Sequence, residues 1–178
     1  MTVFPGSSDS FELSDFPGPS GPSGDETAEP EQAAAWHRDV AKRTFNAAWA
    51  LIDEPDRSPE EDRRMLLLAC ASRVHWGEAG GAREHAIGDW QVGHVLALLG
   101  EGPLALSFAR QALATVEAHG WTDFTLASAY EGVARAYAAS GDEAGREEYA
   151  AKCREAMDAL PEEDRDVIAG QLATVPEV

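Results

Sequence analysis

The chain has 178 residues, and its 32 Asp and Glu outnumber its 14 Lys and Arg, which gives a net charge of −18 at pH 7. This length fits one domain with a tail, and the hydrophobic fraction of 44% is enough for a core. The acidity argues against binding nucleic acid or an anionic membrane through a general basic patch. No window approaches the roughly eighteen apolar residues of a membrane-spanning helix.

Several features of composition favour a cytoplasmic protein. The start, MTVFPGSSDS, has neither a basic leader nor an apolar run. The two cysteines, Cys70 and Cys153, lie far apart in segments expected to be helical, where small buried thiols are more common than a disulfide or a nucleophile. Twelve Arg against two Lys, with abundant Ala and Gly, suggests a GC-rich bacterial genome.

The first segment, residues 1–28, differs from the rest of the chain. It contains FPGPSGPSGDE, and no Lys or Arg precedes Arg38. A segment this rich in Pro, Gly, Ser and acids buries too little apolar surface to offset its ordering entropy, so we expect a disordered tail. Phe4, Phe11 and Phe16 are spaced among acids and serines, as in short motifs that dock into a groove, and they raise the alternative of self-association through the tail.

Residues 29–178 are expected to form one all-α domain. Apolar residues recur at helical spacing, Ala is abundant, and no stretch alternates as a strand does. We predict seven helices joined by short linkers, with consecutive helices antiparallel. Their expected ranges are about 30–53, 58–77, 82–99, 103–118, 123–141, 142–159 and 161–173. The second helix has the clearest start, because Ser58 can act as N-cap, Pro59 fits the first turn and Glu61 completes a capping box.

A repeat appears when the glycines that end two helices are aligned. Gly141 follows Gly100 by 41 residues, and the small residues Gly93 and Ala134 each lie seven positions earlier. A residue without bulk at such a position lets two helix backbones approach closely. The spacing therefore indicates helix pairs that pack in the same way twice.

The segments AIGDWQVGHVLALLGEGPLALSFARQAL and ASAYEGVARAYAASGDEAGREEYAAKC resemble tetratricopeptide repeats (TPRs). The 41-residue period is longer than the usual ~34, Arg146 stands where a small residue is common, and neither unit ends in the signature proline. The resemblance covers about residues 84–158. It implies a right-handed α-solenoid of about three helix pairs with a C-terminal capping helix, similar to uncharacterised bacterial TPR-like proteins.

TPR arrays bind peptides on the concave face lined by the first helix of each pair, and this resemblance implies a groove here. The residues expected to line it are Arg38, Lys42, Trp49, Trp90, His94, Ser128, Glu131 and Arg135. Tryptophan and arginine often contribute most of the binding energy at interfaces, and a partner's carboxylate could pair with Arg135 or Lys42. The alternative is that Trp49 and Trp90 only pack between helices.

A second candidate site lies around the Gly80-Gly81 turn. His75 and His85 should lie at similar height on the two sides of this hairpin, and Asp89 follows His85 by one helical turn. Imidazole and carboxylate suit zinc or iron, but no H-E-x-x-H or comparable motif is present and no further ligand can be named. The alternative is a polar cluster in which His85 binds Asp89 or a loop carbonyl.

Other catalytic signatures are missing from the sequence. It has no G-x-S-x-G elbow, no P-loop and no dinucleotide-binding fingerprint. We therefore expect a non-enzymatic protein- or peptide-binding module, an adaptor or scaffold without a cofactor, and keep a metal or enzymatic site at His75, His85 and Asp89 as the alternative. Whether the groove takes a peptide or a small molecule is open at this point.

Overall fold

The computed structural model describes residues 28–178, and these residues are all-α. They form the helices α1 (Ala28–Ile52), α2 (Pro59–Ala79), α3 (Ala82–Leu98), α4 (Gly102–Ala118), α5 (Phe124–Ala139), α6 (Glu143–Met157) and α7 (Glu162–Ala173). The seven predicted helices are confirmed, with ends that differ by only a few residues. The expectations for Phe4, Phe11 and Phe16 fall on residues 1–27, outside the described part of the chain.

The helices begin where the sequence places side-chain caps. The Ser58 side chain accepts a hydrogen bond from the Glu61 backbone N–H, and the Glu61 carboxylate accepts one from the Ser58 backbone, so the predicted capping box is present. Asp123 and Asp142 cap α5 and α6 in a related way, each accepting a bond from a backbone N–H inside its helix.

Three helices end at glycines in the left-handed region. The φ angles are +78° at Gly100, +63° at Gly120 and +73° at Gly141, at the ends of α3, α4 and α5. After Gly100, the Glu101 N–H reaches back to the Leu96 carbonyl at 2.9 Å, which satisfies one of the last carbonyls of the helix. These turns are short, so each following helix folds back on the one before it.

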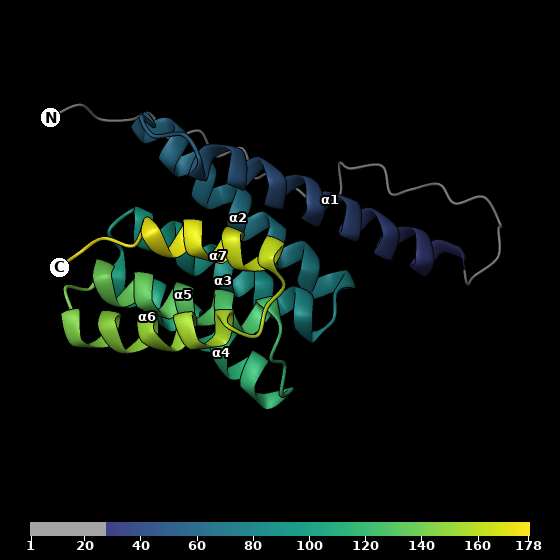
Figure 1. The fold of residues 1–178 in the computed structure, drawn as a ribbon. Coiled ribbons are helices and arrows are strands. Elements are labelled where there is room, and N and C mark those ends of the chain that lie inside the picture. The colour runs from purple at the N-terminus through teal and green to yellow at the C-terminus, as the bar shows by residue number, and fades with distance from the viewer. Residues whose placement is uncertain (1–27) are drawn as a thin grey trace, which may run out of the picture.

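The helices pack as three consecutive pairs (Figure 1). α1 lies against α2, α3 against α4, and α5 against α6, while α3 also contacts α5. Gly93 shows why the second pair is close, because a Cβ there would lie 3.2 Å from both the Ala105 carbonyl oxygen and the Ala109 nitrogen. The small residue expected at this position is therefore needed for the approach of α3 to α4.

The main core runs through the first five helices. Most of its fully buried members are alanines and valines, and Met65 is a larger one; examples are Ala48, Val95, Val116 and Val133. None of the seven helices of residues 28–178 combines the length and the hydropathy needed to cross a bilayer.

The last helix, α7, is held by a second, smaller core. Ile168 is completely buried there with Ala127, Cys153 and Met157 from α5 and α6. In Figure 1, α7 lies between α5 and α1. No Cα atom of α7 lies within 8 Å of one in α1, so the two helices face each other without packing together. The space between them is where the candidate site lies.

Candidate functional site

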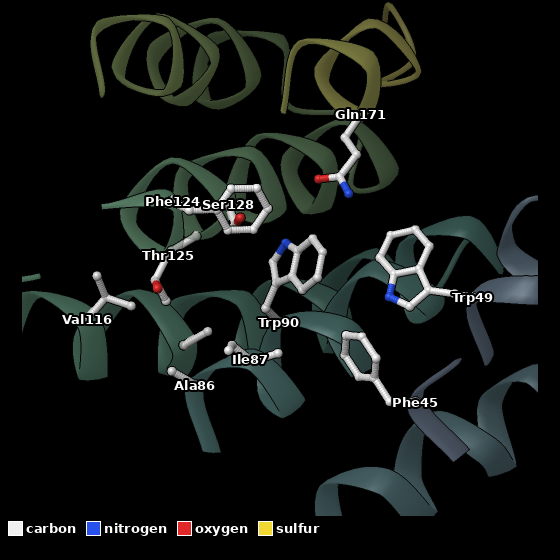
Figure 2. Close-up of a pocket in the computed structure, with 12 residues that line it drawn as sticks. Phe45, Trp49, Ala86, Ile87, Trp90, Val116, Phe124, Thr125, Ser128 and Gln171 are labelled. Atoms are coloured by element: carbon white, nitrogen blue, oxygen red, sulfur yellow. The ribbon is translucent and has the colours of Figure 1, made fainter. Parts of the chain in front are cut away.

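A deep apolar hollow of about 320 Å³ is lined by residues of α1, α3, α4, α5 and α7 (Figure 2). Most of its wall is carbon, and one lining residue comes from α7. The residues around it are Phe45, Trp49, Ala86, Ile87, Trp90, Ala112, Val116, Phe124, Thr125, Ser128, Ala129 and Gln171. Its volume is at the lower end of the range of small-ligand pockets, roughly 300–1,000 Å³.

Aromatic rings from separate helices form the floor and one side of the deep hollow. Trp90 on α3 is only 6% exposed, and its ring centroid lies 5.7 Å from that of Trp49 on α1. Phe45, one turn before Trp49, is 6.4 Å from it. Trp90 keeps its position because Gly132 of α5 has no side chain; a Cβ there would lie 2.6 Å from the indole ring.

Two polar atoms at this hollow have no hydrogen-bond partner within residues 28–178. One is the hydroxyl oxygen of Ser128, a residue that is 5% exposed, and the other is the side-chain oxygen Oε1 of Gln171. Figure 2 shows Ser128 on α5 and Gln171 reaching down from α7. Thr125 differs from them, because its hydroxyl already accepts a bond of 2.7 Å from Arg83. A buried polar atom without a partner is costly, so these two atoms are suited to a ligand that supplies one.

A shallower hollow of about 600 Å³ adjoins the deep one and shares Trp49 and Gln171 with it. The remaining residues of its lining are Ile52, Asp53, His94, Leu98, Arg135, Asp166, Val167, Gly170 and Thr174. Leu98 is 37% exposed and Val167 is 49% exposed, so this hollow offers apolar surface that no other helix of residues 28–178 covers.

A third hollow of about 630 Å³ adjoins the opposite side of the deep one and shares Ile87, Phe124 and Thr125 with it. The other residues around it are Arg83, Thr122, Asp123, Ala159, Leu160, Pro161 and Asp164. Along α3 the lining therefore passes from Ile87 through the deep hollow to Leu98. We call this continuous surface of the three hollows the groove.

A buried ionic network borders the groove through Arg135 and continues behind it. Glu131 is fully buried and Arg135, one turn later, is 2% exposed; the guanidinium donates to the Glu131 carboxylate at 2.6 Å. The other carboxylate oxygen accepts a bond of 3.3 Å from Trp90 Nε1. Arg135 also donates to the Gln171 carbonyl and the Thr174 hydroxyl, each at 2.7 Å, and so ties α7 to α5.

His94 borders the same network but does not join it. Its Nδ1 atom lies 3.9 Å from the Glu131 carboxylate, beyond hydrogen-bond distance, and has no partner in the described residues. Burial, together with the nearby Arg135 cation, lowers the pKa of His94 well below its ordinary value. The imidazole is therefore neutral at pH 7 and packs edge-on against Trp49 and Trp90.

The eight residues expected to line a groove divide into four groups. Trp49, Trp90 and Ser128 line the deep hollow, while His94 and Arg135 line the shallow one. Glu131 lies behind the surface, fully buried. Arg38 and Lys42 are exposed on α1 and line none of the three hollows.

The expected pairing of Arg135 with a partner's carboxylate does not fit this geometry. Its guanidinium is buried and already bound by Glu131, Gln171 and Thr174. Arg135 is buried this completely because α7 and the residue after it, Thr174, pack over its guanidinium. The sequence predicted α7 only as a polar cap. Lys42 takes part in no ion pair within residues 28–178, but it lines none of the three hollows.

The hairpin residues do not converge on a metal site. His75 Nδ1 lies 2.9 Å from Nδ1 of His37 on α1, whereas His85 Nε2 lies 3.0 Å from the Trp76 carbonyl oxygen. Asp89 pairs with Arg73. No group of three or more metal-binding side chains occurs within residues 28–178. The three residues are therefore not brought together as a ligand set. Of the two partners expected for His85, Asp89 or a loop carbonyl, neither is the one observed, because the Trp76 carbonyl belongs to the last turn of α2.

Sequence reasoning missed Phe45, Phe124 and Gln171. Phe45 lies one turn before Trp49 on the same helical face, so its spacing could have revealed it. Nothing in the sequence indicated Gln171, because its place depends on how α7 folds back. The thiol prediction is confirmed in part: both cysteines are free, but only Cys153 is buried and Cys70 is partly exposed. Burial raises the pKa of Cys153 to about 12.

Comparison of the chain with models of protein families, with curated proteins and with solved structures found no match.

Proposed function

We propose that this protein is a non-enzymatic binding module that receives an extended segment of a partner protein in the groove between α1 and α7. The observation that carries the proposal is the continuous lining from Ile87 to Leu98 along α3, with an apolar hollow at its centre. The distance along the helix is about 16 Å at 1.5 Å per residue. A segment of about five extended residues, at roughly 3.3 Å each, matches this length.

The arrangement of helices supports a repeat-type module. Three helix pairs follow one another, and the equivalent glycines Gly100 and Gly141 end α3 and α5 with the same backbone turn. We propose that these pairs form a TPR-like array whose concave side is the groove, with α7 as the last helix of the array. We propose that such an array acts as an adaptor or scaffold in the cytoplasm.

The chemistry of the groove favours binding over catalysis. The Glu131 carboxylate is held by Arg135 and Trp90, which leaves it no proton-transfer role. Ser128 has no base within hydrogen-bond distance of its hydroxyl among the described residues. The available groups of the groove are apolar side chains, the two unpartnered oxygens and the carboxylates of Asp53, Asp164 and Asp166 at its ends, which are suited to recognition.

Selection from a display library of random dodecapeptides tests the proposal. The full chain is compared with Trp49→Ala, which removes a wall shared by two hollows, and with Trp36→Ala as the matched control. Trp36 lies on the same helix, is 55% exposed and lines none of the hollows. Peptides enriched by the wild type and by Trp36→Ala should be lost with Trp49→Ala, provided that both variants melt near the wild-type temperature.

Two results would count against the binding module. One is enrichment of the same peptides by Trp49→Ala, which would move the binding surface away from the groove. The other is an absence of peptide enrichment over the bare support, which would remove the peptide-binding function.

A further inference from the structure

We infer that the partner segment is cationic and inserts one aromatic side chain with an N–H or O–H donor, a tryptophan or a tyrosine, into the deep hollow. This inference rests on the proposed function and specifies the chemistry of its partner. It depends on three features of the groove: its aromatic walls, its two unpartnered oxygens and the sign of its unpaired charges.

The aromatic walls favour a flat ring as the anchor. Trp49 and Trp90 tilt toward each other at 36° between ring planes, and Phe45 continues the same surface. Aromatic rings gain from offset and edge-to-face contacts with other rings beyond the area that they bury. Among residues 28–178 no charged side chain lines the deep hollow, so a charged anchor would lose its hydration there without finding a counter-ion.

The unpartnered oxygens require a donor on that ring. Gln171 Oε1 can only accept a hydrogen bond, and Ser128 Oγ can accept one as well. They come from α7 and α5, on the side of the hollow away from Phe45 (Figure 2). An indole N–H or a phenol O–H supplies a donor to one of these two oxygens, whereas a phenylalanine ring supplies none.

The unpaired charges at the two ends of the groove are negative. Of the arginines that line it, Arg83 pairs with Asp123 and Arg135 with Glu131. The carboxylates of Asp53, Asp164 and Asp166 also line the groove and take part in no ion pair within residues 28–178. Asp53 and Asp166 flank the shallow hollow, and Asp164 lies at the third. A segment with Lys or Arg on both sides of its aromatic residue is complementary to this pattern.

The chain's own N-terminal segment does not match this chemistry. It contains no Lys or Arg before Arg38, and its aromatic residues Phe4, Phe11 and Phe16 have no donor. The acidic chain, with its net charge of −18, also attracts a basic partner over distance. The groove is therefore assigned to a separate, basic protein segment.

Four labelled heptapeptides test the inference by fluorescence anisotropy with the full chain. The reference probe is Lys-Lys-Ser-Trp-Ser-Lys-Lys, acetylated and amidated, and the others replace Trp by Phe, Trp by Ala, or every Lys by Glu. We expect the Ala probe to bind about 30-fold more weakly and the Phe probe about tenfold more weakly. The Glu probe should bind at least about tenfold more weakly at low salt, since like charges then meet.

Protein variants locate each effect. Ser128→Ala should weaken the Trp probe but not the Phe probe, because only the indole uses the hydroxyl. The double change Asp53→Asn and Asp166→Asn should weaken the reference probe about fivefold, from two exposed charge pairs. The matched control is Asp56→Asn with Asp158→Asn, which changes the net charge equally on exposed residues outside the groove.

Each part of the inference has a result that overturns it. Equal binding of the Lys and Glu probes overturns the cationic partner, and equal binding of the Trp and Phe probes overturns the donor. A failure of all four probes, while library-selected peptides still bind at Trp49, overturns the inference and leaves the binding module standing. If the triple variant Phe4→Ser, Phe11→Ser and Phe16→Ser bound the reference probe about tenfold more tightly than the wild type, the groove would be assigned to the chain's own N-terminal segment instead.

Discussion

Trp90 Nε1 donates a hydrogen bond of 3.3 Å to the carboxylate of Glu131, a residue 41 positions further along the chain. This separation equals the spacing between Gly100 and Gly141, so the bond joins equivalent positions of the two repeat units. Glu131 also binds Arg135, and Arg135 binds α7. The repeat thus places in its interior a polar network that connects α3, α5 and the last helix, directly below the groove.

Breaking the buried ion pair should destabilise the protein strongly. Arg135→Met leaves the Glu131 carboxylate buried without its cation, and we expect the free energy of unfolding to fall by about 3–5 kcal/mol. Adding Glu131→Leu should recover part of this loss, because the double variant buries no charge. Urea denaturation of the two single variants and the double variant measures the coupling. Additive losses would mean that the two charges do not stabilise each other.

The control for this prediction is the pair of Glu148 and Lys152 on α6. It has the same four-residue spacing, and its side chains are 60% and 40% exposed. Lys152→Ala should cost less than about 0.5 kcal/mol, because solvent screens the pair.

The attachment of α7 should weaken when Thr174 loses its hydroxyl. Its oxygen accepts a bond from Arg135 at 2.7 Å and lies next to the last turn of α7. Thr174→Val should cost about 1 kcal/mol and speed amide hydrogen exchange in α7 more than in α3. Thr115→Val, at a threonine whose hydroxyl bonds only within α4, is the matched control. Unchanged exchange in α7 would show that the Thr174 hydroxyl does not help to hold the helix.

Burial of neutral His94 should make stability depend on pH. Its pKa in the folded state lies well below 6.5, because burial and Arg135 disfavour the imidazolium. Below pH 6.5 the unfolded chain binds a proton at His94 that the folded chain does not bind. The contribution of neutral His94 to the free energy of unfolding is therefore fully present above pH 6.5 and is lost progressively as the pH falls below it. The slope contributed by this one group approaches about 1.4 kcal/mol per pH unit.

The change His94→Phe keeps an aromatic ring and removes the proton site. Chemical denaturation between about pH 5 and pH 8, the range around an ordinary histidine pKa, should then show a shallower slope than the wild type. His119→Phe, at the exposed C-cap of α4, is the matched control. An identical slope in the wild type and His94→Phe would show that His94 takes up its proton in the folded state.

Gly93 should be intolerant of a side chain, whereas Gly170 should accept one. At Gly93 an added Cβ would lie 3.2 Å from two backbone atoms of α4, which cannot move without separating the helices. Gly93→Ala should therefore cost about 1–3 kcal/mol. At Gly170 a Cβ would meet nothing within 4 Å, so Gly170→Ala should gain up to about 1 kcal/mol of helix propensity. Thermal melting compares the two variants. Equal changes in melting temperature would contradict a need for a small residue at Gly93 in the packing of α3 against α4.

The sequence by itself determined the helices of this protein and the way consecutive helices meet. Helix starts at Ser58 and ends at Gly100 and Gly141 depend on caps and on left-handed turns, which involve neighbouring residues only. The small residue at Gly93 indicated close packing because its period matched that of Ala134. Local chemistry and periodicity were enough for these features.

Only the tertiary structure decided what each candidate site residue does. Whether Arg135 faces a partner or a buried carboxylate depends on where α7 lies, and α7 is positioned by the long-range burial of Ile168. Likewise His75 meets His37 across two helices rather than His85 across the nearer turn. Contacts between distant segments follow from packing of the whole chain, and no local pattern in one sequence encodes them. The groove, its two unpartnered oxygens and its acidic ends therefore became visible only once the helices were placed together.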